Sequence, residues 1–172
     1  MNQEVTQEVS DQGTESQPRS LVVCAVDGSA ASQTALAWAV DDATRRGAVL
    51  RVVGAWSWVP GGDQQAYVGM DEARTVAEAH TRNAVQAVMG QGASDVEVVV
   101  REGQTSEVLL AASIDADLLV LGSHAHSAVH DALVGSTSSR VLRHATCPVV
   151  ILPSPARRER DVRRVEERAA AF

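Results

Sequence analysis

Five short apolar runs separated by helical segments are the feature that most constrains the fold of this chain of 172 residues. The runs are largely continuous rather than alternating, which is typical of strands covered on both faces in a parallel sheet. Because right-handed β-α-β connections place helices on both faces, the pattern predicts an α/β domain with a doubly wound, five-stranded parallel sheet. The predicted strands are 21–27, 49–56, 95–101, 117–122 and 147–153.

Polar segments flank this predicted domain, which we place at 20–153. Residues 1–19 are acidic and polar, with almost nothing apolar to bury, and we expect a disordered tail. Residues 154–172 interleave six Arg with four acidic residues, and this spacing predicts a charged, partly helical tail. Its alternative interpretation is a docking segment for an acidic partner.

Charge and composition exclude several classes of function. The net charge of −7 argues against sequence-independent binding to nucleic acid or to an anionic membrane. The five aromatic residues are too few for a base-stacking platform. All 15 basic residues are Arg, so neither a Walker-type phosphate loop nor a Schiff-base mechanism, which both need Lys, is available.

The cysteines and the N-terminal segment indicate a cytoplasmic protein. Cys24 and Cys147 are too few and too far apart for a metal knuckle or a disulfide framework, and we expect buried thiols. The first twenty residues lack the basic and apolar regions of a secretion signal. No apolar run approaches the roughly 20 residues of a membrane span.

A predicted crevice at the sheet edge is the candidate binding site. In the strand order 3-2-1-4-5, the loops after strands one and four diverge at the carboxyl ends of the strands. Asp27 and Gly122 lie there, and the next helix begins after Gly135. A carboxylate can accept hydrogen bonds from a ribose or an adenine amine, and glycine-rich backbone can donate N–H groups to phosphate.

These residues resemble the universal stress protein family, whose nucleotide-binding members carry a G-x2-G-x9-G-[ST] loop after the fourth strand. Gly122, Ala125, Gly135 and Ser136 match that spacing, with alanine in place of the second glycine. The segments AVDGS and ATCPVVIL look like the opening and closing strands of the family, so the resemblance covers about residues 20–153. It implies a single Rossmann-like domain of the adenine nucleotide α hydrolase type, with the strand order 3-2-1-4-5.

The resemblance also implies a ligand, namely ATP or another adenine nucleotide, with or without Mg²⁺. If position 125 needs a positive φ, alanine there costs roughly 1 kcal/mol and weakens binding. The implied nucleotide-binding residues are Asp27, Ala55, Leu121, Gly122, Ala125, Gly135, Ser136 and Thr137.

A homodimer is the assembly that the resemblance implies. The last strands of two copies would run antiparallel across a two-fold axis, which gives a contact that closes on itself. The expected interface residues are Val149, Val150 and Ile151.

Three functions from different classes remain open. The first is a nucleotide-binding regulatory or stress-protective protein that is not an enzyme. The second is a family member without nucleotide that acts through dimerisation, and the third is a slow ATPase. The cluster of His124, His126 and His130 suggests a metal site only weakly, because no cysteine or carboxylate stands at a typical ligand spacing.

Overall fold

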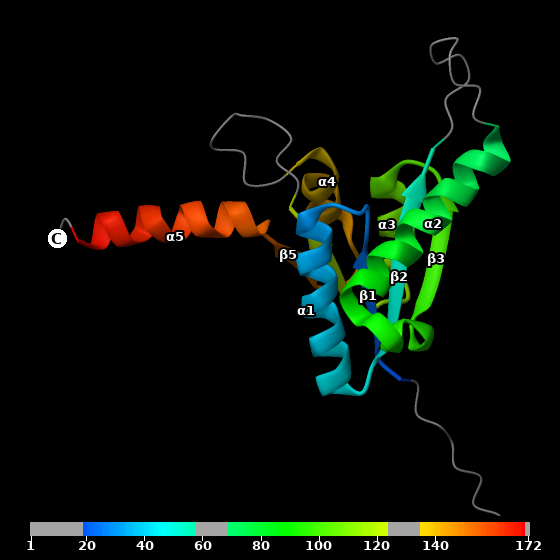
Figure 1. Cartoon of the computed structure of the whole chain (residues 1–172), viewed down its shortest axis with the longest axis horizontal. Coiled ribbons are helices and arrows are strands. Elements are labelled where there is room, and N and C mark those ends of the chain that lie inside the picture. Colours follow the sequence, from blue (N-terminus) through cyan, green and yellow to red (C-terminus); the bar gives the residue numbers. More distant parts are fainter. Residues whose placement is uncertain (1–18, 58–68, 124–134, 171–172) are drawn as a thin grey trace, which may run out of the picture.

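A five-stranded parallel sheet in the order β3-β2-β1-β4-β5 forms the centre of the domain in the computed structural model (Figure 1). The structure describes residues 19–57, 69–123 and 135–170. The strand order confirms the predicted doubly wound sheet, because the chain runs outward from β1 to β3 and then continues on the other side of β1. The strands are β1 (Leu21–Ala25), β2 (Val49–Trp56), β3 (Glu97–Glu102), β4 (Leu118–Gly122) and β5 (Val149–Leu152).

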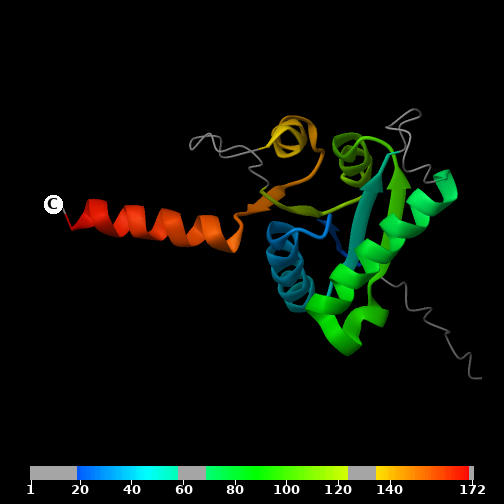
Figure 2. The same ribbon diagram turned by 45° about the horizontal axis from the view of Figure 1, so that its top comes forward.

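Helices cover both faces of the sheet (Figures 1 and 2). The helices are α1 (Ala30–Arg46), α2 (Met70–Met89), α3 (Thr105–Ala112), α4 (Ser136–His144) and α5 (Pro155–Ala169). α1 and α2 pack on one face and α3 and α4 on the other, whereas α5 extends away from the domain. Within the described ranges, none of these helices has the length and apolar character of a membrane span.

The ends of several strands differ from the predicted boundaries. β1 ends at Ala25 rather than at Asp27, because the Asp27 carboxylate already accepts a hydrogen bond within the following turn. β3 begins only at Glu97, since the short 3-10 helix η1 (Gly90–Asp95) occupies the preceding residues. β5 spans Val149–Leu152, two residues shorter than predicted at its start, where Pro148 has no N–H to donate.

The core consists of two apolar layers, one on each face of the sheet. Successive side chains of a strand point to opposite faces, so Val23 packs with Leu109 and Val141 in one layer while Cys24 packs with Leu36 in the other. These side chains are at most 2 % exposed. Burial on both faces explains why the strands read as continuous apolar runs.

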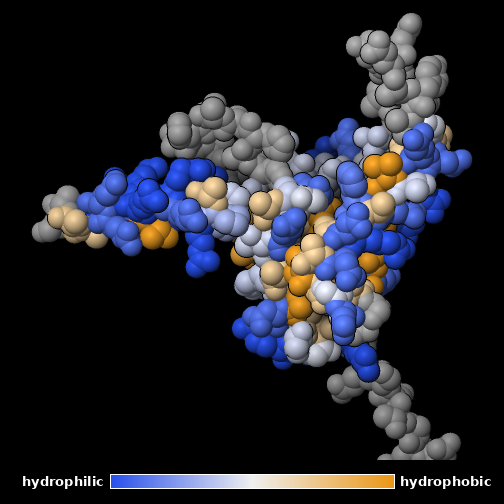
Figure 3. Space-filling model, in the orientation of Figure 1, coloured by the Kyte–Doolittle hydropathy of each residue, from blue (hydrophilic) through white to orange (hydrophobic). Residues whose placement is uncertain are grey.

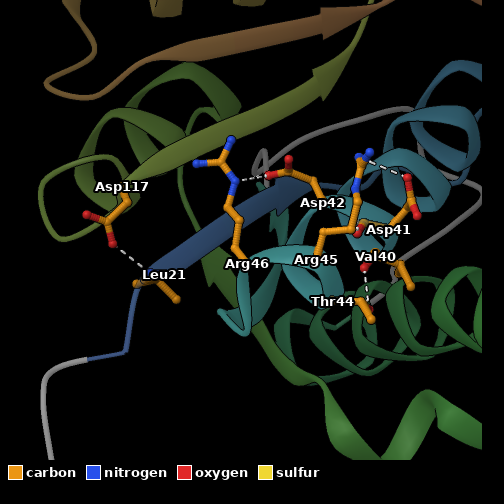
Figure 4. A network of polar contacts seen from close by, with 8 residues as sticks. All are labelled: Leu21, Val40, Asp41, Asp42, Thr44, Arg45, Arg46 and Asp117. Atoms are coloured by element: carbon orange, nitrogen blue, oxygen red, sulfur yellow. Dashed lines mark hydrogen bonds and ion pairs between the residues drawn. The ribbon is translucent and has the colours of Figure 1, made fainter.

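Hydrogen bonds between β1 and the start of β4 fix the amino edge of the sheet (Figure 4). The Leu21 N–H donates to a carboxylate oxygen of Asp117 at 2.7 Å, and the Asp117 N–H donates to the Leu21 carbonyl at 2.9 Å. Arg46 and Asp42 form an ion pair at 2.7 Å near the end of α1. Asp117 therefore ties the start of β4 to the start of β1.

Gly54 provides a test of how β2 packs against α2. A Cβ placed at Gly54 would collide with the buried hydroxyl of Thr81. We expect Gly54→Ala to lower the free energy of unfolding by about 2 kcal/mol, because this close packing cannot relax fully. In urea denaturation, the same change made in a Thr81→Ala background should cost less than half as much. Equal costs in the two backgrounds would contradict this packing.

Candidate functional site

Three candidate residues lie at or just after the carboxyl ends of three adjacent strands, β2, β1 and β4. Ala25, the last residue of β1, pairs with Val53 in the parallel register of β1 and β2; Asp27 lies in the turn that follows β1, and Ala55 lies two residues after Val53. Cys24 pairs with Val120 in β4, and Gly122 follows two residues later. The structure thus brings Asp27, Ala55 and Gly122 together, as the predicted crevice requires.

The side chains of Ala55 and Leu121 point to the face of the sheet that α3 and α4 cover. Leu121 is only 3 % exposed and packs within the apolar layer that contains Val141. Ala55 is half-buried against the same layer. Leu121 is therefore a core residue at the end of β4, and only Ala55 of the two is partly exposed.

Asp27 is held in a tight turn between β1 and α1. Its Oδ1 accepts a hydrogen bond from the Ser29 N–H at 3.1 Å, across Gly28, whose φ of 82° suits glycine. The Ser29 hydroxyl then accepts from the Ser32 N–H at 3.1 Å and caps α1. This chain of short-range bonds fixes the Asp27 carboxylate at the carboxyl edge, where its side chain remains exposed.

Gly122 lies against the first turn of α1. A Cβ at this position would stand 2.5 Å from the carbonyl carbon of Ala31 and 2.7 Å from the backbone nitrogen of Ser32. Both are backbone atoms, so the contact cannot be relieved by a rotamer change. From the sequence, Gly122 was expected only as a phosphate-binding glycine, and its contact with α1 was not predicted.

Ser123 follows Gly122 directly and was not among the implied nucleotide-binding residues. Its N–H donates to the Leu152 carbonyl at 2.7 Å, which extends the pairing of β4 with β5. Its side chain is 7 % exposed, and its hydroxyl has no hydrogen-bond partner in the described part of the chain. A buried hydroxyl without a partner is costly, and a ligand group at this edge would satisfy it.

The N-terminus of α4 supplies the second half of the candidate site. Gly135 is the N-cap residue, and no side chain caps the helix among the residues that the structure describes. The N–H groups of the first turn are thus available to an anion. Ser136 is exposed and Thr137 half-buried, whereas Ser138 is buried and points into the domain.

Part of the predicted loop lies outside the described residues. This applies to Ala125, the second position of the glycine pattern, and to His124, His126 and His130. Within ranges 19–57, 69–123 and 135–170, no group of three or more His, Cys, Asp or Glu side chains is arranged to hold a metal ion.

The two thiols lie in unreactive surroundings. Burial raises the pKa of Cys24 to about 12, and its side chain is fully enclosed in the core. Burial also raises the pKa of Cys147, which is half-buried rather than buried as the sequence predicted. Since the thiolate is the nucleophile, both cysteines behave as small apolar side chains.

Comparison with known proteins gives a family match over the whole sheet. The model of the universal stress protein family matches residues 19–153. Universal stress protein Rv1996 of Mycobacterium tuberculosis is 34% identical over 154 residues, which cover 79% of this chain and 49% of the relative. Universal stress protein Rv2624c of the same species is 31% identical over 135 residues, covering 77% and 48%. The chain spans about half the length of these curated relatives.

Solved structures share the same architecture. Universal stress protein UspA from Lactobacillus plantarum superposes with a TM-score of 0.60 at 25% identity, over 79% of this chain and 99% of that protein. A universal stress protein in complex with cAMP gives a TM-score of 0.58 at 24% identity, over 80% and 99%. The latter likeness extends to the fold alone.

The contact between Gly122 and α1 predicts that any side chain at position 122 lowers the stability of the fold. Gly122→Ala should lower the free energy of unfolding by about 3 kcal/mol, because neither backbone segment can move away without disturbing the core. Gly92→Ala is the matched control, since a Cβ there meets nothing closer than a methionine methyl at 3.9 Å. Chemical denaturation measures both; a Gly122→Ala variant as stable as the control would refute the contact.

Proposed function

This chain belongs to the universal stress protein family, and we propose that it is an adenine-nucleotide-binding protein with a regulatory or protective role under stress. One observation carries this proposal: the exposed Asp27 carboxylate and the N-terminus of α4, which no side chain of the described residues caps, follow neighbouring strands at their carboxyl ends. A ligand with a hydrogen-bond donor at one end and an anion at the other fits this arrangement, and a nucleotide has both.

Each part of the nucleotide has a complementary group. Asp27 would accept hydrogen bonds from the ribose or the adenine amine, and the small Ala55 would leave room for the base. The backbone of Gly122 and Gly135 and the hydroxyls of Ser136 and Thr137 would meet ribose and phosphates, and the buried Ser123 hydroxyl would gain a partner. The family member in complex with cAMP supports an adenine nucleotide as the ligand class. We take ATP as the first candidate.

We propose that the nucleotide is bound rather than turned over. The chain contains no Lys to bind the β and γ phosphates. Mg²⁺ would arrive with the phosphates and would find hydroxyl groups at α4. The two free cysteines fit the reducing cytoplasm, which we propose as the compartment.

A second candidate function is a family member that has lost its nucleotide. It is favoured by Ala125, which replaces the second glycine of the loop pattern. A methyl group there would hinder backbone approach to a phosphate. The slow ATPase ranks behind both, because the sequence offers no paired base and metal carboxylate for it.

Nucleotide binding is tested by calorimetric titration with ATP. Asp27→Ala should weaken binding about tenfold, because one charged hydrogen-bond acceptor is lost. Gly135→Val should weaken it by steric exclusion, and Ala125→Gly should strengthen it. Asp41→Ala is the control, since it removes an equal charge from an exposed position on α1.

The titration separates the candidate functions. Equal affinity in Asp27→Ala, Gly135→Val and wild type would contradict the proposed site. No heat of binding in wild type, together with binding in Ala125→Gly, would favour the family member that has lost its nucleotide.

We also propose a homodimer that forms through β5, the edge strand next to β4. The Pro148 and Leu152 carbonyls accept hydrogen bonds from β4, at 3.0 and 2.7 Å. Because the backbone groups of a strand alternate in direction, those of Val149 and Ile151 face away from β4, where a second β5 can pair with them. The side chains of Val149, Val150 and Ile151 are all half-buried against the core layers, so the pairing proposed here is carried by the backbone.

The proposed pairing of two β5 strands predicts that the dimer depends on the outward-facing N–H of Ile151. Ile151→Pro removes an outward N–H and should give a monomer, since proline is tolerated at an edge strand but cannot donate. Ile151→Ala is the matched control, because it loses the side chain but keeps the N–H, and it should remain dimeric. Light scattering after size exclusion measures both; a folded Ile151→Pro dimer would exclude the pairing.

A further inference from the structure

α5 projects from the sheet beyond its β5 edge and packs on almost nothing (Figures 1 and 2). It begins at Pro155, three residues after β5 ends at Leu152, and it lies outside the region that matches the family model. It touches α1 where it leaves the domain. None of its residues from Pro155 to Ala169 is buried.

A helix of this kind is not stable on its own. α5 has 15 residues, about the length at which isolated helices are only marginally stable in water even with favourable sequences. Arg157 and Asp161 form an ion pair at 3.4 Å. Ion pairs four residues apart stabilise an isolated helix by only about 0.2–0.5 kcal/mol. Packing against another surface is the usual source of helix stability.

One face of α5 carries a narrow apolar stripe. Val162 is 48% exposed and Val165 is 66% exposed, and Ala169 follows four residues later on the same face. Figure 3 shows the projecting helix as mostly blue, with a small orange patch on its lower side. The opposite face carries Arg160 and Glu167. Spacing of three and then four residues is that of a helix whose stripe packs on a partner surface.

Charge gives the second argument for the nature of the partner. α5 has six Arg and four acidic residues, a net charge of +2, whereas the whole chain carries −7. Residues 1–18 account for −4 of the remaining −9, so the domain at 19–153 carries −5. The domain of a second copy is therefore opposite in net charge to the basic helix, and the two are complementary in sign.

We propose that α5 is an arm that packs, through Val162 and Val165, on the domain of a second copy of this chain. The inference rests on the pairing at β5 proposed above, because a copy paired with β5 must lie on the side toward which α5 projects. The helix reaches about 22 Å at 1.5 Å per residue. That length exceeds the roughly 10 Å between packed elements, so the stripe reaches the helices that flank the β5 of the partner.

The experiment is sedimentation of the full chain over a range of concentrations, in roughly 0.5 M NaCl to screen exposed charges. Val162→Asp/Val165→Asp should weaken the dimer by at least about 30-fold, because charged side chains replace buried apolar ones. Arg160→Asp is the matched control: it also lowers the net charge by two, on the opposite face, and should change the dimer constant by less than about threefold. All three positions are exposed, so both variants should stay folded.

A double variant as dimeric as Arg160→Asp would overturn the proposal while leaving the pairing at β5 intact. A monomeric wild type would overturn both, but not the nucleotide site, which the ATP titration tests separately.

Binding to vesicles of phosphatidylserine and phosphatidylcholine is the remaining outcome to measure. A basic helix with an apolar stripe can lie on an anionic bilayer, but such helices usually present larger side chains such as Trp, Phe or Leu. Sedimentation of wild type with these vesicles, lost in the double variant, would assign the stripe to a membrane surface and overturn the proposal. No sedimentation is the expected result.

Discussion

The close approach of β4 to α1 is the constraint on which the candidate site depends. At Gly122 no Cβ fits, because the first turn of α1 lies where it would be. That approach places the turn after β1, with Asp27 and the cap Ser29, beside the end of β4. The next residue, Ser123, is buried, and its N–H continues the pairing with β5. Gly122, which the family motif assigns to phosphate binding, is thus also a packing residue, and its contact with α1 sets the position of the candidate site.

The amino and carboxyl ends of the strands have different roles. At the amino ends, Asp117 and Leu21 exchange two hydrogen bonds, which fix the register of β1 and β4. At the carboxyl ends, a buried hydroxyl and the N–H groups of α4 have no partner among the described residues. Satisfied polar groups stabilise the fold, whereas unsatisfied ones at a crevice are suited to a ligand. This contrast supports ligand binding independently of the family resemblance.

The fold could be predicted because its signals are local. Buried parallel strands read as apolar runs, and Gly47 marks the end of α1 with a φ of 62°. The strand order followed from the family resemblance and from the general behaviour of β-α-β units. The exact ends of β1 and β3 could not be predicted, since a carboxylate in a turn and a short 3-10 helix decided them. The contact of Gly122 with Ala31 joins residues about ninety positions apart, so no local pattern could reveal it.

Hydrogen exchange measured by mass spectrometry with and without ATP tests the central claim most directly, namely that a nucleotide binds between β1, β4 and α4. The account predicts slower exchange in three segments, at Asp27 to Ser29, at Gly122 and Ser123, and at Ser136 to Ser138. Exchange near Leu21 and Asp117, at the opposite edge, should not change. Protection confined to other segments, or no protection at ATP concentrations that saturate a related nucleotide-binding member, would contradict it.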